Sequence, residues 1–198
     1  MKTLLNPLII SAFIVTMLLG SIAHLMYGNC QSSKWHYIIQ RFYMTDNLPK
    51  WMLQKSLRGS DSFRPIKIYQ DFSGIWYRWY KTGELYSTRH IKMGIDNGRV
   101  SGFHENGKKG FEGEYVNGKV NGMFISWDES GLMLYKEVFD FGIKVSSETW
   151  PPEAPGFSQK EYFERNGAVS KTEFLMNGKV TRTTQGSVIE DLLKSLEP

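Results

Sequence analysis

A 24-residue spacing of glycines is the feature that most constrains the fold of this chain. Gly83, Gly107 and Gly131 follow one another at this interval. The same period separates the members of two further series, which are Gly94, Gly118 and Gly142, and Gly74, Gly98 and Gly122. A fixed period of this length is typical of tandem-repeat proteins, in which each unit buries apolar surface against the next. We therefore expect a repeat fold whose function lies on surfaces rather than in a catalytic pocket.

Each repeat unit has the arithmetic of a β-hairpin. Steps of 11 and 13 residues alternate along the glycines, as from Gly83 to Gly94 and on to Gly107. This alternation predicts a strand, a tight turn, a second strand and a slightly longer turn. Asn-Gly dipeptides recur in register with the period, and they favour type I′ turns because both central residues need a positive φ. The sequence predicts a mainly β fold, an elongated antiparallel meander of about four hairpins.

The fourth unit is displaced from the strict period. The stretch from Phe103 to Gly107 recurs as Phe163 to Gly167, and the displacement is 12 residues. We interpret residues 146–156 as an inserted Pro-rich loop, because three prolines in five residues cannot lie inside a central strand. If the protein has a specific recognition point, this break in the period is where we expect it.

The repeat also resembles a known family. Residues 74–83, which contain Trp76, Trp79 and Tyr80, and residues 112–122 are similar to MORN repeats. The Tyr-x-Asn-Gly-Lys element at 115–119 resembles the bacterial MORN-variant form, and the similarity covers roughly residues 72–180. The first unit matches less closely, and Ser158 replaces the leading glycine of the fourth. The resemblance implies an open β-meander used for protein or membrane interaction, in a group often labelled antitoxin.

The N-terminus carries a long apolar segment. No charged residue lies between Lys2 and Lys34, and residues 8–27 are almost entirely apolar. Such a segment is long enough for a transmembrane anchor, which needs about 20 residues. The alternative is a secretory signal peptide cleaved near Ala23. We favour a retained single-pass anchor, because apolar residues continue beyond Ala23, with the repeats exported to the periplasmic or extracellular side.

These features divide the chain into four parts. Residues 1–30 are predicted to be the signal-anchor or transmembrane segment and 31–65 a juxtamembrane helical segment. The repeat domain is expected at 66–182 and a C-terminal capping helix at 183–198. A capping box at Ser187–Glu190 and an apolar stripe support that last helix, which could instead dock on a partner. The stripe comprises Ile189, Leu192, Leu193 and Leu196.

No catalytic constellation is visible. The chain has one cysteine, Cys30, and four histidines without the spacing of a metal site. Glu112 and Glu114 are interpreted as strand-face charge. The net charge is only +4, with both signs mixed along the chain, which does not favour a nucleic-acid partner. We predict no enzyme, no cofactor, no metal and no small-molecule substrate.

Aromatic residues recur with the repeat and define the candidate interaction surface. We predict that this surface binds an unidentified protein partner, while the N-terminal helix binds the membrane. The predicted function is a membrane-tethered, non-enzymatic repeat protein that mediates protein–protein interaction or scaffolding at the cell envelope. The alternative is an antitoxin or immunity-type protein that binds and neutralises a toxin. The surface comprises Trp76, Trp79, Phe103, Tyr115, Trp127, Phe139 and Trp150.

Overall fold

The computed structural model describes residues 6–53 and 68–186. The chain divides into two compact units. The first comprises Met1–Tyr69 and Trp79–Gly83, and the second comprises Gln70–Arg78 and Glu84–Pro198. The predicted C-terminal capping helix falls on residues 187–198, which lie outside the described residues.

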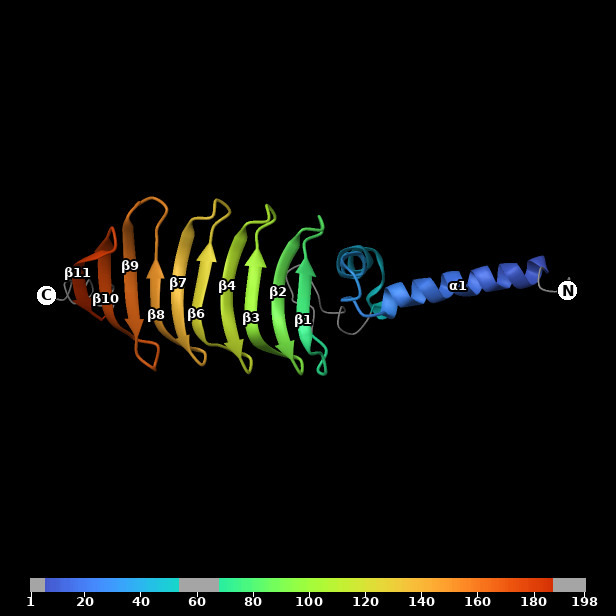
Figure 1. Cartoon of the computed structure of the whole chain (residues 1–198), viewed down its shortest axis with the longest axis horizontal. Helices are drawn as coiled ribbons and strands as arrows, with labels where there is room; N and C mark the ends of the chain where they lie inside the picture. The colour runs from blue at the N-terminus through green and yellow to red at the C-terminus, as the bar shows by residue number, and fades with distance from the viewer. Residues whose placement is uncertain (1–5, 54–67, 187–198) are drawn as a thin grey trace. The chain divides into compact units, whose positions relative to one another are not determined.

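The second unit is built on one 11-stranded antiparallel sheet, so the predicted mainly β meander is confirmed. Strands that are neighbours in the sequence are neighbours in the sheet, and β5 pairs with β4 beside this path (Figure 1). The strands are β1 (Gly74–Trp79), β2 (Leu85–Lys92), β3 (Ile95–Phe103), β4 (Lys109–Val116), β5 (Lys119–Val120), β6 (Gly122–Trp127), β7 (Met133–Asp140), β8 (Ile143–Thr149), β9 (Phe157–Phe163), β10 (Val169–Met176) and β11 (Lys179–Gln185).

Short turns and longer loops alternate along the sheet, as the 11- and 13-residue steps predicted. In each short turn both central residues have positive φ, the geometry of a type I′ turn. The longer loops span residues 104–108 and 128–132 and are closed by backbone hydrogen bonds. We call the strand ends joined by these loops the long-loop side, and the opposite ends the short-turn side. The short turns are Met93-Gly94, Asn117-Gly118, Phe141-Gly142 and Asn177-Gly178.

The Asn-Gly dipeptides do not all form short turns, which corrects the expectation from their pattern. Only those at 117–118 and 177–178 do so, while those at 106–107 and 166–167 lie in five-residue loops. Asn97-Gly98 lies inside β3, where Arg89 pairs with Val100 but Ile91 pairs with Asp96. Residues 97–99 of β3 therefore oppose the single residue His90 of β2, and β3 bulges there, with Gly98 at φ 115. The positive φ is required by a bulge rather than by a turn.

The displacement of the fourth unit is half a repeat, not an inserted loop. Ser146 to Thr149 belong to β8 and pair with β9, so only residues 150–156 form the connection. The added half-unit of one strand and one connection reverses the direction of everything that follows. The loop at 164–168 closes with Glu164 N donating to Ala168 O, as His104 N donates to Lys108 O in the loop at 104–108. The loop at 104–108 consequently lies at the strand ends of the long-loop side, and the equivalent loop at 164–168 lies at the opposite strand ends, on the short-turn side.

The strand register assigns side chains to two faces, because successive residues point to opposite sides. Gly102 pairs with Phe111, and Phe111 pairs with Ser126, on what we call the glycine face. A Cβ atom on Gly102 would lie 2.0 Å from the Phe111 ring, and one on Gly113 would lie 2.4 Å from the Phe124 ring. These glycines make room for two aromatic rings that stack at 5.8 Å.

The opposite side of the sheet, which we call the charged face, carries residues of both signs. Glu112 pairs with Ile125, and Ile125 pairs with Lys136. From there opposite charges face one another across consecutive strands, an arrangement that stabilises cross-strand pairing. The row continues through Glu148, Lys160 and Glu173.

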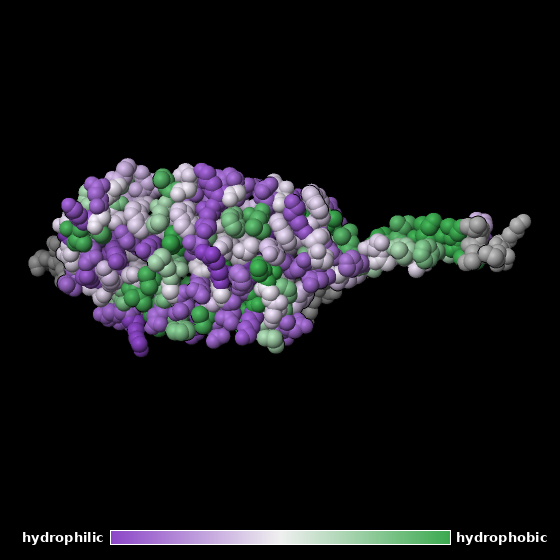
Figure 2. All heavy atoms as spheres, in the orientation of Figure 1, coloured by the Kyte–Doolittle hydropathy of each residue, from purple (hydrophilic) through white to green (hydrophobic). Residues whose placement is uncertain are grey.

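The first unit begins with α1 (Pro7–Tyr27), an apolar helix capped by Asn6. At 1.5 Å per residue its 21 residues span about 31 Å, close to the hydrocarbon thickness of a bilayer. None of its residues is buried, and Figure 2 shows apolar side chains along it. Among the described residues, α1 is the one helix that is both long enough and apolar enough to cross a membrane. This fits either a signal sequence or a single membrane anchor.

A second, irregular helix follows within the same unit. It comprises α2 (Lys34–Ile38), the π-helix η1 (Ile39–Met44) and α3 (Thr45–Asn47), followed by the short 3₁₀ turn η2 (Lys50–Met52). In the sequence Trp35, Ile38, Ile39 and Phe42 recur at the spacing of one apolar helix face, which predicts that they are buried together, but Trp35 is 62% exposed. The π turn changes the angular spacing of the side chains, and the buried residues are His36, Tyr37, Ile38, Gln40 and Arg41.

Candidate functional site

The aromatic residues predicted as one interaction surface lie on different surfaces. Phe103 follows Gly102 in β3 and so lies on the charged face, as does Trp127, which follows Ser126 in β6. Tyr115, two residues after Gly113, lies on the glycine face, and alternation along β7 places Phe139 on that same face. The expected regular aromatic face is therefore divided between the two sides of the sheet.

The two tryptophans of β1 take part in packing. Trp76 is fully buried and meets Phe72 edge to face at 5.1 Å. Trp79 clusters with the first unit, where its ring meets Tyr37 at 5.1 Å. Trp150 differs from both, because its half-buried ring lines a hollow.

This apolar hollow, of about 300 Å³, lies on the long-loop side of the sheet. The Pro-rich connection 150–156 forms one wall, and the end of the β6–β7 loop with the start of β7 forms the other. Leu132 on the second wall is 62% exposed. The hollow is lined by Leu132, Met133, Leu134, Trp150, Pro151, Pro152, Ala154, Pro155, Gly156 and Phe157.

Backbone hydrogen bonds hold the Pro-rich connection in place. Trp150 N donates to Leu134 O at 2.9 Å, which ties the start of the connection to β7. At its other end Asn177 N donates to Gly156 O at 2.6 Å, so the reversed fourth unit supplies this anchor. None of the described residues in the lining has a side chain that titrates near neutral pH. The described part of the lining therefore suits apolar groups.

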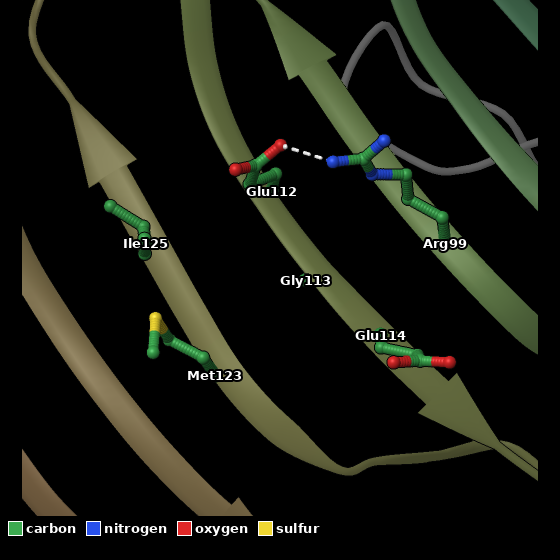
Figure 3. Close-up of a pocket in the computed structure, with 6 residues that line it drawn as sticks. All are labelled: Arg99, Glu112, Gly113, Glu114, Met123 and Ile125. Carbon is green, nitrogen blue, oxygen red and sulfur yellow. Dashed lines mark hydrogen bonds and ion pairs between the residues drawn. The ribbon is translucent and has the colours of Figure 1, made fainter.

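A second hollow, of about 420 Å³, lies on the charged face across β3, β4 and β6. Figure 3 shows Arg99 and Glu112 directed toward one another above Gly113, with a 3.2 Å ion pair between them. Lys109 also binds Glu112 at 2.7 Å. The hydrogen bond from Lys109, helped by the charge of Arg99, holds the pKa of Glu112 below its usual range. Both cations therefore favour the ionised form of Glu112.

The remaining residues of this second hollow are Glu114, Met123 and Ile125. Glu114 on β4 and Met123 on β6 are both exposed and line the hollow from separate strands (Figure 3), so the hollow combines a carboxylate with apolar surface. Among the described residues, no group of three or more His, Cys, Asp and Glu side chains could hold a metal ion.

Sequence reasoning missed the partners of both hollows. Leu132, Met133 and Leu134 meet Trp150 only because two connections lie on the same side of the sheet, which no local motif encodes. Arg99 meets Glu112 through strand register. The spacing of the glycines could have aligned β3 with β4, but their register shifts at Phe103, which pairs with Lys109 beside the 104–108 loop, and the period does not reveal this shift.

Comparisons with known proteins do not identify a family. No family matches the chain, and no curated protein matches it. Six chains of solved structures match. The crystal structure of TarM is 17% identical at a TM-score of 0.30, covering 66% of this chain and 23% of TarM. The GtfA/B complex bound to UDP and GlcNAc is 10% identical at 0.28, covering 86% and 41%. The chain spans less than half the length of either, and at these scores neither carries an argument about fold or function.

Proposed function

We propose that this protein is a membrane-tethered, non-enzymatic repeat protein that binds a protein partner through the apolar hollow beside Trp150. The hollow is the observation that carries the proposal. It lies at the break in the repeat, its lining is apolar, and both ends of its wall are held by backbone hydrogen bonds. A preformed apolar hollow admits an apolar side chain with little loss of conformational freedom in the protein.

The tether and the repeat type are part of the same proposal. The length and exposure of α1 support a retained anchor. In this proposal the repeats lie on the periplasmic or extracellular side. Cleavage near Ala23 would instead release the repeats as a secreted protein. The alternation of short turns and longer loops supports MORN-variant repeats.

A photo-crosslinking experiment tests the binding site. A photoreactive phenylalanine analogue at Leu132 places the probe on the rim of the hollow, and the same analogue at Met93 provides a matched control. Both residues are well exposed, but Met93 lies on the short-turn side. We expect a discrete protein adduct from position 132 and none from position 93, after irradiation of cells that express the full chain.

A second variant separates binding from folding. Trp150→Ala in the Leu132 probe background should remove the adduct while changing the thermal midpoint of unfolding little, because the Trp150 ring lines an open hollow. Equal adducts from both positions, or none from either, would refute the assigned site. The identity of the adduct decides between roles: a toxin would favour the immunity-type alternative, and an envelope component would favour scaffolding.

A further inference from the structure

The first unit fixes the depth of its second helix relative to α1. His36 Nε2 lies 3.0 Å from Leu25 O, and the Gln40 side-chain amide donates to Leu25 O and Gly28 O at 2.9 Å each. Ser32 Oγ lies 2.6 Å from His36 Nδ1 on the other side of the imidazole. His36 and Gln40 are buried, so these contacts form a protected polar cluster at the C-terminal end of α1.

This cluster supplies hydrogen-bond partners for carbonyl groups at the C-terminal end of α1. The last carbonyl groups of a helix have no partner within the helix, and an unpaired carbonyl is costly where water is scarce. His36 and Gln40 contact two such oxygens from outside the helix. The hydrogen bonds thereby hold α2 against the last turn of α1, so the position of α1 in a bilayer sets the position of α2.

The depth of Trp35 follows from this geometry. Leu25 lies about 3 Å below Tyr27 along the α1 axis, at 1.5 Å per residue. The headgroup region adds about 5–7 Å to each side of the hydrocarbon core. A helix held within hydrogen-bonding distance of Leu25 therefore lies at the boundary between the hydrocarbon core and the headgroup region when α1 spans the core. Trp35, in the first turn of α2, is 62% exposed at this depth.

The chemistry of the exposed side chains suits the same environment. Lys34 Nζ lies 5.2 Å from the Trp35 ring, so a cation and an aromatic ring are presented together. Trp51 and Tyr27 of the same unit are 75% and 57% exposed. Tryptophan and tyrosine are enriched at membrane–water interfaces, where an apolar ring and a polar group are both satisfied, and lysine attracts lipid phosphates.

We propose that Trp35 and Trp51 insert into the lipid headgroup region, with Lys34 at the phosphates, as a membrane-interface platform locked to the end of α1. This inference rests on the proposed membrane tether, since it needs α1 to span the bilayer. The occupant of this surface is the phospholipid bilayer itself. The platform orients the chain at the point where it leaves the membrane.

Fluorescence quenching by brominated lipid tests the platform in the full chain. The protein is reconstituted into phosphatidylcholine vesicles with bromine near the carbonyl end of the acyl chains, which quenches only indoles at that depth. The chain has six tryptophans. We expect the double variant Trp35→Phe/Trp51→Phe to lose most of the quenching, and the matched double variant Trp127→Phe/Trp150→Phe to keep it.

Vesicle flotation after alkaline carbonate treatment separates the two proposals. If the chain stays with the vesicles and both double variants are quenched equally, or the wild-type protein is not quenched, the interface platform is refuted while the tether stands. If carbonate releases the chain, the tether fails and the platform fails with it. Phenylalanine retains an apolar ring at each position, and unchanged far-ultraviolet circular dichroism of both variants would confirm that folding is not the cause.

Discussion

Replacing Gly102 by alanine should destabilise the sheet, because the new methyl group would clash with the Phe111 ring. The φ of Gly102 is ordinary, so alanine fits the backbone, but its Cβ would lie 2.0 Å from Cε1 of Phe111. Restoring a 3.4 Å contact requires the ring to move by about 1.4 Å, away from its stack with Phe124. Overpacking of this kind costs about 1–3 kcal/mol, which corresponds to roughly 3–10 °C in the thermal midpoint.

A double-mutant cycle tests whether the Phe111 ring causes this loss of stability. In a Phe111→Ala background the obstructing ring is absent, so Gly102→Ala should stabilise the protein by about 0.5–1 kcal/mol, because glycine is unfavourable inside a strand. Thermal unfolding of the four full-length proteins in detergent, followed by far-ultraviolet circular dichroism, measures the cycle. The same loss of stability in both backgrounds would show that Phe111 is not the reason for glycine at position 102.

Two further predictions concern a turn and an ion pair. Phe141 holds φ 44 in a short turn where the corresponding residues Asn117 and Asn177 hold 51 and 52; because asparagine tolerates this region better, Phe141→Asn should stabilise by about 0.5–1 kcal/mol, and a lower thermal midpoint than wild type would contradict this. The pKa of Glu112 is lowered on folding, so its contribution to stability is present above its unfolded pKa and is lost as pH falls through the lower folded value. Glu112→Gln should therefore flatten the fall of the thermal midpoint as the pH drops below the ordinary range of a glutamate pKa, and parallel curves for the two proteins would contradict the assignment.

The alternation of strands could be predicted from sequence because it rests on backbone conformation at single residues. Gly94, Gly118 and Gly142 each hold the positive φ of a short turn, and this requirement is visible in the 24-residue period. Asn97-Gly98 does not form a short turn, because a bulge also requires a positive φ and leaves the same dipeptide in the sequence. The residue type at a position therefore indicates the backbone conformation there, but it does not indicate whether that conformation belongs to a turn or to a bulge.

The candidate site was harder to predict, because it depends on contacts between separate connections. Trp150 was identified from the sequence, but Leu132 was not, since their proximity follows from which sides of the sheet their connections occupy. The polar cluster in the first unit was missed for a related reason. His36 and Gln40 occur within a helix whose apolar spacing predicted a different buried face, and the π turn at Ile39–Met44 leaves no clear sequence signal.

The half-unit step has a consequence for any partner that recognises this sheet. A strictly periodic surface offers equivalent docking frames 24 residues apart, so a partner that contacts one repeat could shift along to the next. The reversal after β8 removes this degeneracy, because the pattern of loops and turns on each side changes there. The half-unit step therefore gives the array one position that a shift by whole repeats does not reproduce. The hollow beside Trp150 lies at that position.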